Sequence, residues 1–303
     1  MRSDSSGMQL RLPATSANLG SGFDAVAVAL DFYLAIKAHP AAEFSIDATG
    51  RDAARCAQIE NNLILGVYER LLIENGGPVV PLAIHMVNGI PLGMGCGSSA
   101  AGRLAGIALA VHFGKLSWSS DQILQTATAL EGHPDNVAAC WLGGFVAAAS
   151  EEGTVRVARA DTPGPWRAIV VLPPAPLATS SARAVLPDTY SRADTVANIQ
   201  AVSLLGLAFA QGRGDLLRAA MNDRIHQPYR APICPMLPYL LPLAGHHGIL
   251  GVALSGAGPS VLVVVDGESG IEDASKAIRA AIKELEAPEL LACRFALLGA
   301  STL

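Results

Sequence analysis

The sequence predicts an α+β protein, because strand patterns and helix patterns are mixed along its whole length. Polar and apolar residues alternate at residues 9–13 and 43–48, as in half-buried strands, whereas the apolar residues within 62–74 follow the spacing of a helix. The 303 residues are 51% apolar and 16% charged, so the chain can bury a sizeable core and does not have the composition of an extensively disordered protein. The sequence shows no internal repeat.

The first half of the chain is expected to form a sheet with helices between its strands. Strands are expected at residues 9–13, 25–38, 43–48, 82–86 and 145–149. Helices are expected at residues 62–74, from the end of a glycine-rich turn at 89–97 to about residue 113, and at 121–130. The acidic first turn of the third helix suits the positive end of a helix dipole.

The second half continues the same mixture. Strands are expected at residues 167–172, 251–254, 260–265 and 292–298, and helices at 192–210 and 270–286. The loop 161–165 and the pair Pro173-Pro174 mark the candidate domain boundary, with an uncertainty of about ten residues or more. We therefore divide the chain into an N-terminal domain, residues 1–160, and a C-terminal domain, residues 161–303.

Charge and cysteine content exclude several classes of function. The net charge is −5 and no cluster of Lys and Arg stands out, so we expect no nucleic-acid partner. The five cysteines lie far apart and form no Cys-x-x-Cys pair, which favours a reducing cytoplasm over a disulfide framework or a zinc site. Residues 1–7 are polar, unlike a signal sequence, and the most apolar helix candidate, residues 100–113, contains Arg103 and is too short to cross a membrane. We expect a cytoplasmic protein with no membrane partner.

The most informative segment is 91–101, Pro-Leu-Gly-Met-Gly-Cys-Gly-Ser-Ser-Ala-Ala, between an expected strand and an expected helix. Alternating glycines let main-chain N–H groups converge, and the helix start adds unpaired donors and a positive dipole end, which together suit phosphate groups. The hydroxyls of Ser98 and Ser99 could cap the helix, bind a phosphate oxygen or ligate Mg²⁺. On this segment alone, an ordinary glycine turn with a serine cap is the alternative. The segment matches neither the Walker A nor the Rossmann pattern, since no Lys follows the last glycine and the spacing differs.

This segment closely resembles the second motif of the GHMP kinases, Pro-x-x-x-Gly-Leu-Gly-Ser-Ser-Ala, with Cys96 in place of the Leu. Because both are modest apolar groups, we expect the turn to be kept. Residues 13–24 resemble the first motif in its homoserine-kinase form, and residues 254–260 resemble the third. Residues 131–138, Glu-Gly-His-Pro-Asp-Asn-Val-Ala, resemble a segment specific to homoserine kinases. The four segments span nearly the whole chain, which is identified by this resemblance as a member of the GHMP kinase superfamily.

The resemblance implies transfer of the γ-phosphoryl group of ATP to the hydroxyl of a small metabolite, with L-homoserine as the best candidate. It implies that Glu131 ligates Mg²⁺ together with a hydroxyl of Ser98 or Ser99, which are the hard oxygens that Mg²⁺ prefers. On the residues alone, Glu131 could instead be a solvated residue at a helix end. The ATP-binding residues that the resemblance implies are Pro91, Leu92, Gly93, Met94, Gly95, Cys96, Gly97, Ser98, Ser99 and Thr179.

Homoserine is a zwitterion, and the resemblance supplies a partner for each of its charges. Arg183 and Arg230 look like the pair for the carboxylate, since Arg can bind a carboxylate through two parallel hydrogen bonds. Asp24 looks like the ammonium partner. On the residues alone, either arginine could be solvated and Asp24 could be a turn residue.

The hydroxyl end of the acceptor is assigned to four residues. Asn18 and Asn136 look like contacts to the hydroxyl, with His133 a further substrate contact and Asp135 beside it. Two mechanisms stay open: Asn136 orients the hydroxyl, whose proton passes to the γ-phosphate, or Asp135 acts as a general base within hydrogen-bond reach of it. We favour Asn136. On the residues alone, Asn18 could stabilise a turn and His133 could cap the preceding helix.

The resemblance also implies an architecture and an assembly. The N-terminal half would be ribosomal-protein-S5-like and the C-terminal half ferredoxin-like, with ATP and acceptor meeting in the cleft between them. A homodimer and a place in threonine biosynthesis follow from the same resemblance. Two rival functions keep the fold: a kinase for a mevalonate-like alcohol or a sugar, and a non-catalytic relative that binds a ligand. The paired arginines with Asp24 favour an amino acid, and the retained Glu131, Ser98 and Ser99 count against a dead site.

Overall fold

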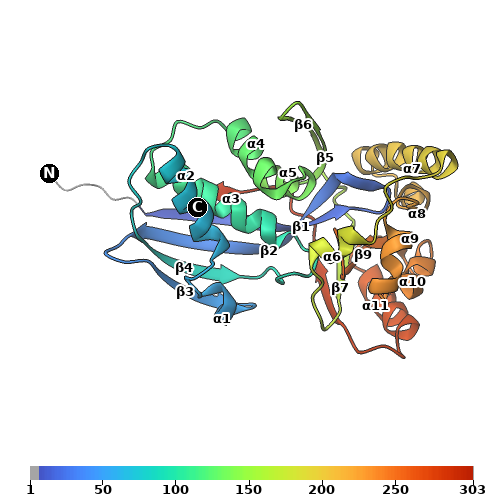
Figure 1. The fold of residues 1–303 in the computed structure, drawn as a ribbon. Helices are drawn as coiled ribbons and strands as arrows, with labels where there is room; N and C mark the ends of the chain where they lie inside the picture. The colour runs from blue at the N-terminus through green and yellow to red at the C-terminus, as the bar shows by residue number, and fades with distance from the viewer. Residues whose placement is uncertain (1–6, 303) are drawn as a thin grey trace.

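The computed structural model describes residues 7–302, which form two sheets side by side with helices packed against them (Figure 1). The first sheet has the strand order β11-β1-β2-β4-β3, and β5 pairs with β2 and β6. Its pairs are antiparallel except β3 with β4. Its strands are β1 Met8–Asn18, β2 Gly22–Pro40, β3 Ser45–Gly50, β4 Leu82–Asn88, β5 Phe145–Glu151, β6 Thr154–Ala160 and β11 Ser301–Thr302.

Helices α2, α3, α4 and α5 lie on one face of the first sheet (Figure 1). The central helix is α3, and most of its residues are buried because it lies among α2, α4, α5 and β1. Gly106 allows α2 to approach closely, since a Cβ there would lie 2.6 Å from the carbonyl oxygen of Ile64. The helices are α2 Leu63–Glu74, α3 Ser98–Phe113, α4 Ser120–Glu131 and α5 Asp135–Leu142, and a short helix, α1 Ala53–Cys56, lies beside β3.

The second sheet is antiparallel with the order β10-β7-β9-β8. Its inner strands consist of Val, Ile and Leu with few exceptions, and β9 is buried throughout, because helices cover it. The strands are β7 Arg167–Leu172, β8 Ile249–Leu254, β9 Val261–Val265 and β10 Glu289–Cys293. The helices of this half are α6 Thr179–Ala184, α7 Arg192–Gln211, α8 Leu217–Ala220, α9 Gln227–Arg230, α10 Leu237–Leu240 and α11 Gly270–Ala281, with 3₁₀ turns at Gly214–Leu216, Ala231–Ile233 and Leu241–Leu243.

The α+β class predicted from the pattern is confirmed, but some expected bounds are wrong. The first strand was expected at 9–13 and continues to Asn18. The last strand was expected at 292–298, yet β10 ends at Cys293, because the chain leaves the second sheet there and Phe295 bridges to Leu30 of the first. The helix expected at 270–286 ends at Ala281, after which Ile282 is buried against the second sheet's core. An apolar run indicates burial but does not tell which sheet receives it.

Some elements were not expected from the sequence at all. These include the helix α5, the strand β6, and the short helices between residues 214 and 243, where prolines at 228, 232, 235, 238 and 242 interrupt any longer helix. The proposed division into residues 1–160 and 161–303 stays a prediction. The pairing of β11 with β1 returns the end of the chain to the first sheet.

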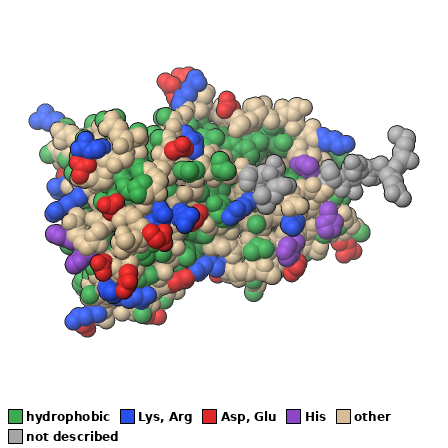
Figure 2. Space-filling model, turned by 180° about the vertical axis from the view of Figure 1, so that it is seen from behind, with side chains coloured by type: hydrophobic (Ala, Val, Ile, Leu, Met, Phe, Trp, Pro, Cys, Tyr) green, Lys and Arg blue, Asp and Glu red, His purple; other side chains and the backbone are tan. Residues whose placement is uncertain are grey.

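Among residues 7–302, α7 is the one helix long and apolar enough to cross a membrane, by length and composition alone, and 22% of its apolar 18-residue stretch is buried. Its inner side packs on the core, with the Phe209 ring stacked 4.5 Å from that of Phe145. Elsewhere on the surface, the face in Figure 2 intersperses Lys and Arg with Asp and Glu, without a continuous basic stripe.

Candidate active site

The turn after β4 presents its main chain and hides its side chains. Gly93, Gly95 and Gly97 have φ angles of 71°, 75° and 73°, the left-handed region that favours glycine. The alternate side chains, Met94 and Cys96, are 8% and 1% exposed and point into the core. Burial raises the pKa of the Cys96 thiol to about 12, so it is a neutral apolar group, in keeping with its replacement of Leu.

Two distant segments of the chain brace this turn. A Cβ on Gly95 would lie 2.2 Å from the carbonyl oxygen of Ser255, and one on Gly97 would lie 1.9 Å from Oγ1 of Thr15. The Thr15 amide donates to the carbonyl of Cys96 at 3.1 Å, and the Ser255 hydroxyl donates to the carbonyl of Gly95 at 2.7 Å. The three segments that resemble the family motifs therefore meet at one point, and glycine is required there by contact as well as by φ.

The turn ends at the start of α3, and no side chain caps this helix. Its N-cap is Gly97, while Ser98 and Ser99 are the first two residues of the helix. The expected alternative of a serine cap is therefore not adopted. An uncapped helix start offers free N–H donors and the positive end of the helix dipole, which favours an anion such as a phosphate.

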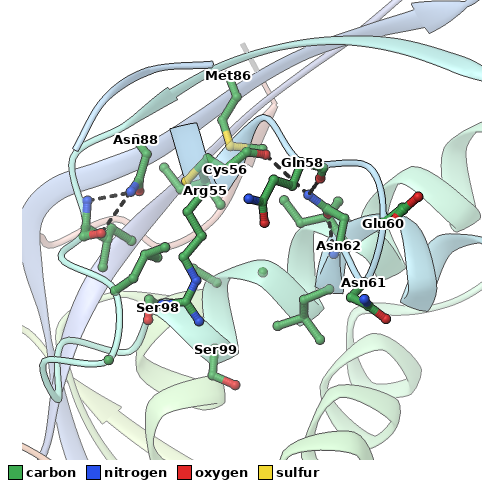
Figure 3. Close-up of a pocket in the computed structure, with 18 residues that line it drawn as sticks. Arg55, Cys56, Gln58, Glu60, Asn61, Asn62, Met86, Asn88, Ser98 and Ser99 are labelled. Atoms are coloured by element: carbon green, nitrogen blue, oxygen red, sulfur yellow. Dashed lines mark hydrogen bonds between the residues drawn. The ribbon is translucent and has the colours of Figure 1, made fainter. Parts of the chain in front are cut away.

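Two cavities meet at this turn. A larger cavity of about 500 Å³ extends toward α1, β4 and the start of α2, and is drawn in Figure 3. A smaller one of about 120 Å³ lies on the other side, toward α5, α6 and α9. Gly93, Ser98 and Ser99 line both, so a single extended ligand could place phosphates over the turn and reach into each cavity.

The larger cavity was not anticipated from the sequence. Asn62 shapes its rim: Oδ1 accepts from the amide of Ile64 at 3.0 Å, and Nδ2 donates to the carbonyl of Gln58 at 2.9 Å. Arg55 extends from α1 toward Ser98 in Figure 3. The Asn62 cap before an apolar helix is visible in the sequence, but nothing there tells that β4 and α3 close the cavity. The apolar part of the lining is Leu34, Leu63, Ile64, Met86, Ile90, Leu92 and Ala101.

The smaller cavity collects most of the residues that the sequence singled out. Leu92 lines the larger cavity instead, and Pro91, Met94 and Cys96 have buried side chains that line neither. The predicted residues that line the smaller cavity are Asn18, Asp24, Gly93, Gly95, Gly97, Ser98, Ser99, Glu131, His133, Asp135, Asn136, Thr179, Arg183 and Arg230.

Asp24 and Arg183 bind each other across the small cavity. The guanidinium nitrogens of Arg183 donate to the two carboxylate oxygens of Asp24 at 2.7 and 3.0 Å, a bidentate pair. Their side chains are 33% and 38% exposed, so solvent and ligand reach them. Asp24 follows a turn fixed by Asn18, whose Oδ1 accepts from the Asp24 amide at 2.9 Å and whose Nδ2 donates to the carbonyl of Gly256 at 2.8 Å. The amide of Asn18 is thus engaged on both sides within the protein.

Arg230 is buried, at 1% exposure, and is held by its neighbours. Its guanidinium donates to the carbonyl of Ala182 at 3.0 Å and to Nδ1 of His226 at 3.1 Å. His226 in turn donates from Nε2 to the carbonyl of Gly20 at 2.8 Å. Burial lowers the pKa of His226, which fits a neutral ring that accepts from Arg230. Burial and the neighbouring Arg183 lower the pKa of Arg230, so a ligand carboxylate placed beside both arginines would offset the repulsion between them.

The start of α5 contributes to the small cavity the residues that were predicted to contact the acceptor hydroxyl. Asn136 accepts on Oδ1 from the hydroxyl of Thr15 at 2.6 Å, which leaves its NH₂ group as the free donor. Asp135 is 1% exposed, and its Oδ1 accepts from His133 Nδ1 at 2.6 Å and from the Asn136 amide at 2.7 Å. Burial alone would lower the pKa of His133, but Asp135, Glu131 and Asp24 together raise it above the usual value.

Asp24, His133 and Asp135 bring ligand atoms within 4.8 Å of one another, a spacing that a metal ion could use. These atoms are already engaged, by Arg183 on Asp24 and by His133 on Asp135. This cluster therefore fits a charged organic acceptor better than a metal.

Glu131 ends α4 directly opposite the start of α3. Its carboxylate is 9% exposed, and Oε2 accepts from the hydroxyl of Ser99 at 3.1 Å. A carboxylate and a hydroxyl beside a phosphate-binding turn are the donor set that Mg²⁺ takes when it is bound with nucleotide phosphates. Arg103, one turn along α3, also donates to Oε2 of Glu131, at 2.5 Å, and to the Ser99 hydroxyl. The sequence shows Arg103 as the charged residue of an apolar helix, but it does not show the pairing with Glu131, because that pairing depends on how α3 and α4 pack.

A turn suited to phosphate binding beside a small polar cavity is typical of kinases that act on small molecules. Similarity to known proteins agrees with this class. Residues 62–144 match the model of the GHMP kinases N terminal domain, and residues 207–284 match the GHMP kinases C terminal model. The chain is 44% identical to the homoserine kinase of Solibacter usitatus, over 87% of this chain and 86% of that one. It is 38% identical to the homoserine kinase of Deinococcus radiodurans, over 85% and 84%. It superimposes on the homoserine kinase structure from Cytophaga hutchinsonii with a TM-score of 0.84 at 24% identity, covering 100% and 99%. The chain belongs to the homoserine kinase family of the GHMP kinases.

Proposed function

We propose that the protein transfers the γ-phosphoryl group of ATP to the hydroxyl of L-homoserine, giving O-phospho-L-homoserine for threonine biosynthesis. The observation that carries the proposal is the small cavity itself. There the uncapped start of α3 faces Asp24, Arg183 and Arg230, so a phosphate site and a zwitterion site share one wall. A single cavity can therefore bring a terminal phosphate to the hydroxyl of a bound amino acid.

The nucleotide would lie along the turn, with its base in the larger cavity. The apolar walls around Leu34, Met86 and Ile90 suit a flat base, and Asn62 at the rim offers a polar edge. The phosphates would lie over Gly93 to Ser99, held by main-chain amides and by the start of α3. Thr179, at the start of α6, lines the same cavity. Just before this helix, the amide of Leu177 donates to the carbonyl of Gly93 at 3.2 Å and so attaches the segment to the turn.

Magnesium would be held by Glu131 and a hydroxyl of Ser98 or Ser99. When bound, it would supply charge neutralisation for the phosphates. The protein's own contribution is to hold these oxygens at the mouth of α3, where Glu131 is shielded from solvent.

The acceptor would replace the bond between Asp24 and Arg183. The homoserine ammonium takes the carboxylate of Asp24, and the homoserine carboxylate takes Arg183 with Arg230 behind it. Each charge that the bidentate pair loses is supplied again by the zwitterion. A ligand with only one of the two charges leaves the other side of the pair unmatched, which favours an amino acid over mevalonate or a sugar.

Asn136 would orient the hydroxyl, and Asp135 would hold His133. The Thr15 hydroxyl fixes the Asn136 amide so that its NH₂ group is free to donate to the acceptor oxygen or a phosphate oxygen. Asp135 already accepts from His133 and from a main-chain amide, and no lysine lines this cavity among residues 7–302. These contacts favour proton transfer to the phosphate over an Asp135 base.

The proposal is tested by ADP release with ATP, Mg²⁺ and a panel of acceptors: L-homoserine, mevalonate and galactose. We expect turnover with L-homoserine and product detected as a phosphate monoester by phosphorus NMR. Faster turnover with mevalonate or galactose would reassign the acceptor. Nucleotide binding without turnover on any acceptor would support the non-catalytic alternative. The homodimer and the cytoplasmic location stay predictions, the first to be tested by sedimentation.

A further inference from the structure

Helix α3 carries one residue among Lys, Arg, Asp and Glu, and that residue is Arg103. Its Nη1 donates both to Oε2 of Glu131, at 2.5 Å, and to the hydroxyl of Ser99. Ser99 itself donates to the same carboxylate oxygen at 3.1 Å. The side chain of Arg103 is 23% exposed and that of Glu131 is 9% exposed, so the three groups form a compact, mostly shielded cluster.

A single guanidinium nitrogen thus lies against Oε2 of Glu131 and the hydroxyl of Ser99, which is one of the two serine hydroxyls proposed as metal ligands. A divalent ion that bridged Ser99 and Glu131 would need both oxygens at about 2.0–2.1 Å, as Mg²⁺ does. While the Arg103 nitrogen keeps its contacts, a metal ion on Oε2 and the Ser99 hydroxyl would lie directly against the guanidinium, whose positive charge repels it. The guanidinium does not give up its charge in proteins, so it can clear the site only by moving its side chain.

We propose that Arg103 is an internal competitor for the divalent cation, holding the metal-binding oxygens until the metal arrives together with nucleotide phosphates. The proposal rests on the function proposed above for the identity of the metal and the nucleotide. A free divalent cation gains only Glu131 and a hydroxyl when it displaces Arg103. A metal·nucleotide complex brings several phosphate charges, which offset the repulsion between the metal and the displaced guanidinium.

The matched readout is metal binding to the protein without nucleotide. Mn²⁺ binding, followed by electron paramagnetic resonance, is compared between the wild type and Arg103→Met. Removing a positive charge that contacts the site is expected to tighten Mn²⁺ binding by about tenfold or more. Arg213→Met is the control, because it changes net charge equally at an exposed pair with Asp215 on the surface.

Two further variants separate competition from a merely structural role. Arg103→Lys keeps the charge and should bind Mn²⁺ as weakly as the wild type. Arg103→Met combined with Glu131→Gln should lose the gain, because the carboxylate is then gone. Arg103→Gln replaces Arg103→Met if the latter fails to fold, as judged by circular dichroism.

Equal or weaker Mn²⁺ binding in a folded Arg103→Met or Arg103→Gln variant would overturn the proposal, since it would mean that Arg103 positions the oxygens and does not compete for them. A gain that survives Glu131→Gln would overturn it as well, because the metal would then lie elsewhere. Failure of the kinase proposal is a separate result. It would appear as absent phosphorylation of homoserine by the wild type, whatever the Mn²⁺ titrations give.

Discussion

The proposed site has a phosphate end, formed by main-chain groups, and an acceptor end, formed by side chains. At the proposed phosphate end, the turn from Gly93 to Gly97 presents main-chain groups and buries the side chains of Met94 and Cys96. At the acceptor end, charged side chains line the cavity and bind one another, as Asp24 does with Arg183. Glu131 lies at the junction and is likewise paired, with Arg103.

The difference teaches which end is prepared before the ligand arrives. The main-chain amides of the turn are held by contacts with Thr15 and Ser255, so we expect the proposed phosphate site to be formed before the ligand binds, apart from the side chain of Arg103. Paired side chains must separate first, so an acceptor is bound only if it restores both charges. We infer that the phosphate end provides affinity and the acceptor end provides selectivity.

The largest effect is expected from a substitution in the glycine turn of the phosphate end. Gly95→Ala puts a methyl group 2.2 Å from the carbonyl oxygen of Ser255 at a φ of 75°. We expect a loss of about 2–5 kcal/mol in the free energy of unfolding from strain and overpacking, and loss of ATP binding. Denaturant unfolding measures the change in the free energy of unfolding, and titration calorimetry measures ATP binding.

Gly153→Ala is the matched control, because its φ is 79° and a Cβ there would contact nothing within 4 Å. It should cost only the conformational part, about 1–2 kcal/mol, and leave ATP binding intact. If the two variants behave alike, contact with Ser255 is not what makes glycine necessary in the turn.

The next effect tests how the acceptor hydroxyl is activated. Asn136→Ala removes the donor that Thr15 holds in place, and we expect kcat to fall about 100-fold, whereas Asp135→Asn should lower it less than about tenfold. Steady-state kinetics measure both. A loss of several orders of magnitude with Asp135→Asn alone, at unchanged homoserine affinity, would make Asp135 the general base.

A smaller effect is expected where selectivity resides. Arg183→Met should raise the KM for homoserine about 10- to 100-fold, because it removes a charged hydrogen-bond partner, and should leave the KM for ATP unchanged. Initial-rate kinetics with each substrate varied in turn measure the two constants, and Arg213→Met serves again as the surface control. An equal rise in both constants would contradict the division of the site into two ends.

The smallest effect concerns His133, whose pKa is raised because its acidic neighbours outweigh burial. Proton NMR should give a titration midpoint above the usual histidine value of about 6.5, and Asp135→Asn should lower it. A raised folded-state pKa means that the protonated ring stabilises the protein fully below the unfolded-state pKa, and that this stabilisation is lost as the pH rises through the folded-state value. As the pH rises through the folded-state pKa, the free energy of unfolding of the wild type should therefore fall by about 1 kcal/mol or less relative to that of His133→Gln. A midpoint below 6.5 would contradict this.

The fold was predictable where the pattern is local and strong. Residues 62–74 and 121–130 are helices within a residue or so of the expected bounds, since a cap and an apolar stripe are properties of a short segment. The path of residues 292–298 was not predictable, because an apolar run is compatible with either sheet. The bridge from Phe295 to Leu30 and the hydrogen bond from the Ala296 amide to the carbonyl of Ala29 attach it to the first sheet.

The sequence by itself determined the place of the glycine turn and its left-handed backbone, because φ preferences and the alternation of glycines are properties of neighbouring residues, but it left open whether a serine caps the following helix. It also supplied the charged residues of the acceptor end, though only through a resemblance to a family. The tertiary structure alone decided which of these residues face each other. Asp24 lies 159 residues from Arg183 and Glu131 lies 28 from Arg103, and pairings of that kind arise from the packing of separate helices and turns. The larger cavity is likewise a gap between β4, α1 and α3, which no single segment contains.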